Sequence, residues 1–160
     1  MAKVLLATDS GPPHTWSLLR VFLESAGHDV SAVHDGEAVL SAVPSDPPEA
    51  LILDTALPTL DGFQVLARLQ QQPSAARLPV LMISGIPAQL GSQLAGSLGA
   101  SAYLCKPFTF QALQQALDEL LGVEHNAPVS APAATAVWPA NGTGPHVLRP
   151  IAGRHQQGAS

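Results

Sequence analysis

Four polar side chains stand at the ends of short apolar runs in this sequence, and their types suit the transfer of a phosphoryl group. Asp54 and Ser84 each follow such a run directly, and Asp9 and Lys106 lie just beyond two others. A carboxylate can act as a nucleophile, and a second carboxylate can help to hold a divalent cation, for which hard oxygen ligands favour magnesium. An ammonium group and a metal ion neutralise charge on a transferring phosphoryl group, and a hydroxyl can bind its oxygens.

The apolar runs predict five buried strands, with helices in the gaps between them. The strands are expected at Lys3–Ala7, Asp29–Val33, Ala50–Leu53, Val80–Ile83 and Ala102–Leu104. The helices are expected at His14–Ala26, Gly36–Val43, Gly62–Gln71, Ala88–Leu98 and Thr109–Leu121. Two of them follow the typical N-cap residues Asp35 and Asp61, and the last begins with the capping residue Thr109. This alternation predicts an α/β fold with a doubly wound parallel sheet. Ligand sites in such sheets lie beyond the carboxyl ends of the strands, so the four polar side chains should converge.

Composition and charge exclude several classes of protein. The 160 residues are 46% hydrophobic, which is enough for a sizeable core, and the formal net charge is −5. The only lysines are Lys3 and Lys106, so no nucleic-acid partner is expected. No apolar run approaches the length of a membrane span, so no membrane partner is expected. Cys105 is the single cysteine, which rules out an internal disulfide and favours a reducing, cytoplasmic location.

The composition changes near Gly122, where proline, alanine and glycine begin to dominate. Residues 1–121 are therefore predicted to form the folded domain and residues 122–160 a disordered tail, because such a segment buries too little apolar surface to offset its ordering entropy. Trp138 and the pair Val147–Leu148 are exceptions that could form a short docking motif, although unstructured chain is the favoured interpretation. The tail is also too short and too weakly patterned for a DNA-binding output domain.

Four segments in this order resemble the motifs of response regulator receiver domains. Asp54–Gly62 (DTALPTLDG) resembles their phosphoacceptor segment, Pro79–Gly85 (PVLMISG) their fourth strand, and Gly99–Phe108 (GASAYLCKPF) their fifth. The opening Lys3–Asp9 also fits, and the match covers about residues 3–121. The resemblance implies a flavodoxin-like fold with five parallel strands in the order 2-1-3-4-5 and five helices.

The resemblance also assigns roles to individual residues of the phosphorylation site. Asp54 would accept the phosphoryl group, and Lys106 would contact it. Mg²⁺ would be the cofactor, held by Asp9, by Asp54 and by the backbone carbonyl of Ala56. The protein would not be an enzyme in the ordinary sense, since it would catalyse only its own phosphorylation and dephosphorylation.

The same resemblance implies a switch and two kinds of protein partner. Ser84 would be the hydroxyl switch residue, and Tyr103 its aromatic partner. A sensor histidine kinase or a phosphotransfer protein would donate the phosphoryl group, and an unknown output protein would read the result in a two-component system or phosphorelay.

Some features depart from the family pattern and keep alternatives open. Receivers usually carry two adjacent acids after the first strand, whereas here Thr8 precedes Asp9, so weaker Mg²⁺ binding is expected. The loop at residues 10–13 is about two residues longer than usual, and the fourth helix is glycine-rich and uncharged. The alternative interpretation is a pseudo-receiver, an interaction module without phosphoryl transfer. A phosphatase of the haloacid dehalogenase class is disfavoured, because position 56 is Ala56 where that class has a second aspartate.

Overall fold

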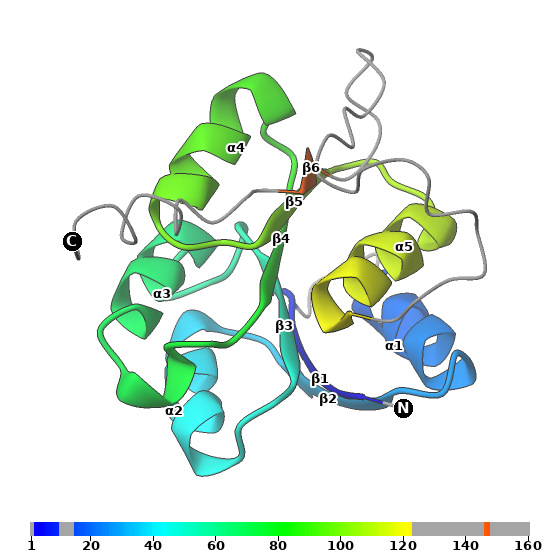
Figure 1. Ribbon diagram of the computed structural model, residues 1–160, viewed down its shortest axis with the longest axis horizontal. Helices are drawn as coiled ribbons and strands as arrows, with labels where there is room; N and C mark the ends of the chain where they lie inside the picture. The colour runs from blue at the N-terminus through cyan, green and yellow to red at the C-terminus, as the bar shows by residue number, and fades with distance from the viewer. Residues whose placement is uncertain (1, 10–14, 123–145, 148–160) are drawn as a thin grey trace, which may run out of the picture.

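A single twisted sheet lies between two layers of helices in the computed structural model, which describes residues 2–9, 15–122 and 146–147. The parallel strands are β1 (Lys3–Ala7), β2 (Asp29–Val33), β3 (Ala50–Asp54), β4 (Val80–Ser84) and β5 (Ala102–Cys105). The helices are α1 (Thr15–Ser25), α2 (Gly36–Ser45), α3 (Gly62–Leu69), α4 (Ala88–Ser97) and α5 (Phe110–Leu121). Helices α1 and α5 cover one face of the sheet, and α2, α3 and α4 cover the other (Figure 1).

The sheet confirms the predicted topology and adds one strand to it. Its order is β2-β1-β3-β4-β5-β6, so the expected parallel order 2-1-3-4-5 is present. The extra strand β6 (His146–Val147) runs antiparallel to β5 along its outer edge. The observed helices and strands lie within two residues of their predicted bounds. A short 3₁₀ helix, η1 (Pro73–Ala75), was not predicted.

The two layers of helices each cover their own hydrophobic core, because alternate side chains of a strand point to opposite faces of the sheet. On β3, Leu51 and Leu53 join the core beneath α2, α3 and α4, whereas Ala50 and Ile52 join the core beneath α1 and α5. Every residue of β3 and of β4 is buried. This two-sided burial explains why the central strands appear in the sequence as continuous apolar runs.

Side-chain caps fix the start of three helices, as the sequence predicts. The Asp35 carboxylate accepts a hydrogen bond of 2.7 Å from the Ala38 N–H at the start of α2. Asp61 forms a capping box with Gln64 at the start of α3, and Thr109 caps α5. Each cap satisfies a backbone N–H group that has no partner inside its helix.

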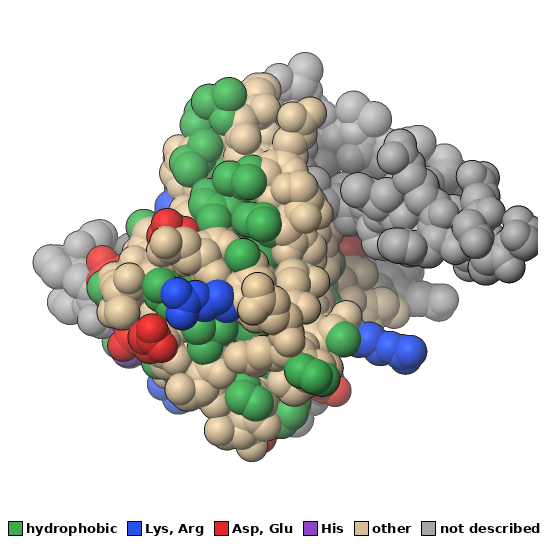
Figure 2. Space-filling model, turned by 90° about the vertical axis from the view of Figure 1, so that its left-hand side faces the viewer, with side chains coloured by type: hydrophobic (Ala, Val, Ile, Leu, Met, Phe, Trp, Pro, Cys, Tyr) green, Lys and Arg blue, Asp and Glu red, His purple; other side chains and the backbone are tan. Residues whose placement is uncertain are grey.

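Helix α4 differs from these helices in its cap and in its surface. It begins after Pro87 with no side-chain cap, and it contains no charged residue. Leu90 is 72% exposed and Leu94 is 48% exposed, one helical turn apart on the same side of the helix. Hydrophobic side chains gather on the upper part of the face drawn in Figure 2, where Figure 1 places α4.

The C-terminal segment is described only in part. Residues 123–145 and 148–160, with Trp138 and Leu148 among them, lie outside the described residues, so the disordered tail stays a prediction. Val147 belongs to β6, where it lies opposite Ala102, and His146 lies opposite Tyr103. Among the described residues, no helix is both long and apolar enough to cross a membrane.

Candidate functional site

The carboxyl ends of the parallel strands bring the predicted site residues to one edge of the sheet. Ala7 of β1 lies opposite Leu53 of β3, so the next residues, Thr8 and Asp54, follow side by side. Ser84 is the last residue of β4 and lies opposite Cys105, the residue before Lys106. The convergence that the sequence predicted therefore follows from the register of the sheet.

Asp54 and Lys106 form an ion pair at the centre of this edge. The Lys106 ammonium donates to Asp54 Oδ2 at 2.6 Å, and the Ala56 N–H donates to Asp54 Oδ1 at 2.9 Å. The Asp54 side chain is only 7% exposed, whereas that of Lys106 is 40% exposed. Both carboxylate oxygens are thus held by donors in a largely buried position, which fixes the direction of the carboxylate. The Lys106–Pro107 peptide bond is cis.

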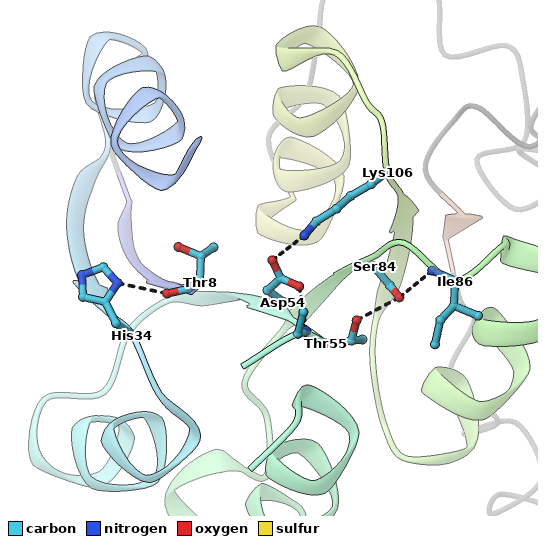
Figure 3. A network of polar contacts seen from close by, with 8 residues as sticks. Thr8, His34, Asp54, Thr55, Ser84, Ile86 and Lys106 are labelled. Atoms are coloured by element: carbon cyan, nitrogen blue, oxygen red, sulfur yellow. Dashed lines mark hydrogen bonds and ion pairs between the residues drawn. The ribbon is translucent and has the colours of Figure 1, made fainter. Parts of the chain in front are cut away.

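Ser84 is the last residue of β4, the strand next to that of Asp54, and is completely buried. Its hydroxyl oxygen accepts one hydrogen bond of 2.9 Å from the Thr55 hydroxyl and another of 3.0 Å from the Ile86 N–H. Figure 3 shows the Ser84 hydroxyl directed toward Thr55 and Ile86, whereas the Asp54 carboxylate is directed toward Lys106. The Ser84 hydroxyl therefore points toward Thr55 and toward the loop that leads into α4.

Tyr103 continues this chain of contacts toward α4. Its phenol donates a hydrogen bond of 2.6 Å to the Ile86 carbonyl oxygen, and its side chain is fully buried. Burial raises the pKa of the Tyr103 phenol, and the Ser84 hydroxyl opposes part of the rise. The ring lies against Gly91 of α4, where a methyl group would come within 2.6 Å of the Tyr103 Cζ atom. The backbone of Ile86 therefore links Ser84, through its N–H, to Tyr103, through its carbonyl.

Thr8 occupies the place where an acid was expected in the family pattern, beside Asp54. Its side chain is buried, and the Thr8 hydroxyl has no hydrogen-bond partner among the described residues. The Thr8 carbonyl contacts His34 Nδ1 at 3.0 Å, and the His34 ring packs edge-on against Trp16 with 4.6 Å between the ring centroids. This corner of the site is thus formed by α1 and the residues after β1 and β2 (Figure 3).

The donors around the site suit a hard cation such as Mg²⁺. Asp9 and Ala56 are both exposed, Asp54 is buried, and the Thr8 hydroxyl is a buried oxygen without a partner among the described residues. Carboxylate, carbonyl and hydroxyl oxygens are the ligands that Mg²⁺ prefers. Within the described ranges, no group of three or more His, Cys, Asp and Glu residues could hold a metal. A cation here would therefore rely on two carboxylates supplemented by other oxygens.

Three residues of this network were missed by the sequence analysis. Thr55 follows Asp54 and contacts Ser84, Ile86 bridges Ser84 and Tyr103, and Gly91 leaves room for the tyrosine ring. The sequence offered a signal only for Gly91, since a glycine inside a helix usually needs a packing reason. Thr55 and Ile86 have no such signal, because their roles depend on contacts between strands and loops.

The sequence matches a known family over most of the described domain. Residues 4–118 match the model of the family described as the response regulator receiver domain. One curated relative is the alkaline phosphatase synthesis transcriptional regulatory protein PhoP of Bacillus subtilis, which is 36% identical over 107 residues, or 67% of this chain and 43% of that protein. Another is the DNA-binding dual master transcriptional regulator RpaA of Synechocystis, which is 32% identical over 132 residues, or 82% of this chain and 54% of that protein.

Solved structures agree with this family match. A putative response regulator from Chloroflexus aurantiacus is 31% identical with a TM-score of 0.69, and the alignment covers 74% of this chain and 97% of that one. The receiver domain of a sensor histidine kinase from Pseudomonas aeruginosa, solved with a magnesium ion in its active site cleft, is 26% identical with a TM-score of 0.69. That alignment covers 76% of this chain and 98% of the other.

The curated regulators are longer than this chain. It spans 43% of PhoP and 54% of RpaA, so the match concerns one domain of each. RpaA is described as a DNA-binding protein. The expectation that this chain has no nucleic-acid partner therefore stays a prediction, which rests on its own charge.

Proposed function

The chain belongs to the family of response regulator receiver domains, and from that membership we propose that Asp54 accepts a phosphoryl group from a phosphohistidine of a partner protein. The observation that carries the proposal is the ion pair between Lys106 and the buried Asp54 carboxylate. A carboxylate held in this way at the carboxyl edge of a parallel sheet stands where α/β folds bind their ligands. The donor would be a sensor histidine kinase or a phosphotransfer protein.

In the transfer, an oxygen of the Asp54 carboxylate attacks phosphorus while the bond from phosphorus to the histidine nitrogen breaks. The products are an acyl phosphate on Asp54 and a neutral or protonated histidine on the donor. Lys106 is already within contact distance of the carboxylate, so its positive charge can neutralise the charge on the phosphoryl oxygens without a large movement. The Ala56 N–H holds the other carboxylate oxygen and so keeps the carboxylate in a fixed orientation.

Magnesium would be held by Asp9, by Asp54 and by the carbonyl of Ala56. When bound, it supplies positive charge that compensates the phosphoryl oxygens. Thr8 supplies no charge beside Asp54, and its uncharged hydroxyl is a weaker ligand than a carboxylate. We therefore expect this site to bind Mg²⁺ more weakly than a receiver with two adjacent acids.

The phosphorylated state would be read through Ser84 and Tyr103. A phosphoryl group on Asp54 favours the arrangement of Ser84 that gives the phosphoryl group a hydrogen bond. Because the backbone of Ile86 contacts both Ser84 and Tyr103, a movement of Ser84 would alter the contact of Tyr103 with the loop before α4. The reader of this state would be a partner protein, because the surface that changes is that of α4 and β5.

The intact mass of the protein after incubation with acetyl phosphate and Mg²⁺ tests the proposal. We expect a gain of one phosphoryl group in the wild type and none in Asp54→Asn, which keeps the size of the side chain and removes its charge. Lys106→Gln should be phosphorylated far more slowly. A gain of mass that persists in Asp54→Asn would place the modification elsewhere and refute the assignment.

The alternative, a pseudo-receiver without phosphoryl transfer, is favoured by Thr8. Its buried hydroxyl stands where an acid would bind the metal. Beryllofluoride, which mimics a phosphoryl group on a carboxylate, separates the two functions. Binding of beryllofluoride in the presence of Mg²⁺ supports the receiver, whereas absence of both binding and phosphorylation at high Mg²⁺ concentration supports the pseudo-receiver.

A further inference from the structure

A strand from the C-terminal part of the chain pairs with the outer edge of β5. In β6, Val147 lies opposite Ala102 and His146 lies opposite Tyr103, so β6 runs antiparallel to β5 (Figure 1). The family match ends at residue 118. The strand β6 therefore lies outside the matched domain, and the receiver family does not account for it.

The edge that β6 covers is a surface to which an extended chain can bind. An edge strand presents a row of backbone N–H and C=O groups, and a peptide can add to it as a further strand. In the parallel part of the sheet β5 is such a strand, because it has β4 on one side only. Pairing with β6 occupies part of its other side.

The sequence around β6 suits a strand that is short and bounded. Val147 and Leu148 are the apolar pair for which a docking role was left open on sequence grounds. Pro145 and Pro150 flank residues 146–149. Proline has no N–H group to donate to a ladder, so these prolines limit the length over which the segment can pair. The structure pairs the first two residues between the prolines with β5.

The covered edge lies beside helix α4. One of the residues that β6 pairs with is Tyr103, whose ring packs against Gly91 of α4. Helix α4 contains no charged residue, and it exposes Leu90 and Leu94. A partner protein that added a strand to β5 would therefore meet an apolar helix surface next to that strand, but it would have to take the place of β6.

We propose that the segment His146–Val147 is a strand bound in cis that closes the β5 edge, and that an extended segment of a partner protein binds this edge only by displacing it. The inference does not depend on phosphorylation of Asp54, because the contact joins main-chain groups of β5 and β6. Residues 123–145 connect β6 to α5, so its binding is intramolecular. Tethering raises the local concentration of a binding segment to the order of millimolar, so a short strand can keep the edge closed.

Amide hydrogen exchange of the full chain, followed by NMR, tests whether the edge is closed. Because N–H groups alternate along a strand, one of the two amides of Ala102 and Tyr103 faces β6. The double-proline variant, His146→Pro with Val147→Pro, removes both N–H groups of β6. In this variant we expect that amide to exchange roughly two- to tenfold faster than in the wild type, the range that one net hydrogen bond implies.

Matched controls separate the strand from general effects of proline. The variant Ala136→Pro with Val137→Pro places two prolines elsewhere in the C-terminal segment and should exchange like the wild type. Val147→Thr keeps the N–H group and should do the same. The amide of Leu51, which donates to the Pro79 carbonyl at 2.9 Å, should be unchanged in every variant.

Two results of the exchange experiment would overturn the inference. The first is equal exchange of Ala102 and Tyr103 in the wild type and in the double-proline variant, since β6 would then protect neither amide. The second is protection that increases with protein concentration, since the strand would then come from a second copy of the chain.

A synthetic peptide of residues 144–150 tests the displacement. The peptide should shift the NMR signals of Ala102 and Tyr103 at a lower concentration in the double-proline variant than in the wild type, where the tethered strand competes with it. Equal concentrations would refute the competition, and no shift in either protein at millimolar peptide would refute the edge as a binding surface. The gain of mass from acetyl phosphate tests the proposed function separately, so the two can fail independently.

Discussion

Gly91→Ala should displace Tyr103 from its buried position beneath α4. An added methyl group would overlap the phenol oxygen of Tyr103 and lie 2.6 Å from its Cζ atom and 3.0 Å from its Cε2 atom. Carbon atoms in contact are separated by about 3.5–4.0 Å, so the ring must retreat by about 1 Å or rotate away. The Tyr103 hydrogen bond to the Ile86 carbonyl, which is 2.6 Å long, cannot survive that movement.

The effect on stability is the sum of two opposing terms. Alanine in place of glycine inside a helix stabilises the fold by about 1 kcal/mol. Overpacking a buried site costs about 1–3 kcal/mol, and the lost hydrogen bond belongs to that cost. The net change for Gly91→Ala is therefore a loss of about 0–2 kcal/mol. Gly96→Ala on the same helix, where Gly96 is only half-buried, should instead gain up to about 1 kcal/mol.

Spectrophotometric titration of tyrosine measures the displacement directly, because Tyr103 is the only tyrosine of the chain. Burial raises the pKa of its phenol in the wild type. The titration of Gly91→Ala should move down toward the ordinary pKa of an exposed tyrosine, whereas Gly96→Ala should titrate like the wild type. Urea unfolding of both variants gives the free energies of unfolding for comparison.

Two results would refute this reasoning. The first is a Gly91→Ala variant whose tyrosine titrates as in the wild type, since the ring would then have kept its buried position despite the methyl group. The second is equal stabilisation by Gly91→Ala and Gly96→Ala, which would mean that helix propensity alone decides both. Either result would place the Tyr103 ring elsewhere than against Gly91.

Four further perturbations have expected outcomes. Thr8→Asp adds a carboxylate beside Asp54 and should tighten Mg²⁺ binding by about tenfold or more, since a unit charge at close range outweighs a hydroxyl; equal affinities in Mg²⁺ titrations would contradict this. Lys106→Gln leaves the buried Asp54 carboxylate with a single strong donor and should lower the free energy of unfolding by about 1–3 kcal/mol. The loss should be smaller when Lys106→Gln is made in the Asp54→Asn variant, and urea unfolding in both backgrounds measures it. Gly62→Ala places a methyl group 2.5 Å from the Asp54 carbonyl oxygen. Because a backbone atom cannot move aside as a side chain can, the substitution should lower the free energy of unfolding by about 1–3 kcal/mol in the same assay. A variant as stable as the wild type would show that the start of α3 can shift. The pKa of the Tyr103 phenol is raised in the folded protein, so near pH 10 the unfolded chain loses this proton before the folded chain does. The free energy of unfolding should therefore fall as pH rises through the folded-state pKa, and this fall should be less steep in Tyr103→Phe.

Much of the fold and of the candidate site was determined by the sequence itself. The central strands β3 and β4 are buried on both faces, so they had to be continuous apolar runs, and Asp54 and Ser84 end those runs. Parallel strands place their carboxyl ends at one edge, so the convergence of Asp54 and Lys106 required only the correct order of strands. Local capping chemistry likewise fixed the starts of α2, α3 and α5.

The tertiary structure alone decided which contacts connect this site to the rest of the molecule. The bond from Thr55 to Ser84 depends on the orientation of two side chains from different strands, and the contact of Gly91 with Tyr103 depends on how α4 packs against β5. The pairing of His146 with Tyr103 joins residues that are far apart in the chain. Apolar periodicity and capping are local properties that a sequence displays, whereas side-chain orientation and the packing of a helix on a sheet depend on every neighbour at once, and for that reason they emerge only in the folded chain.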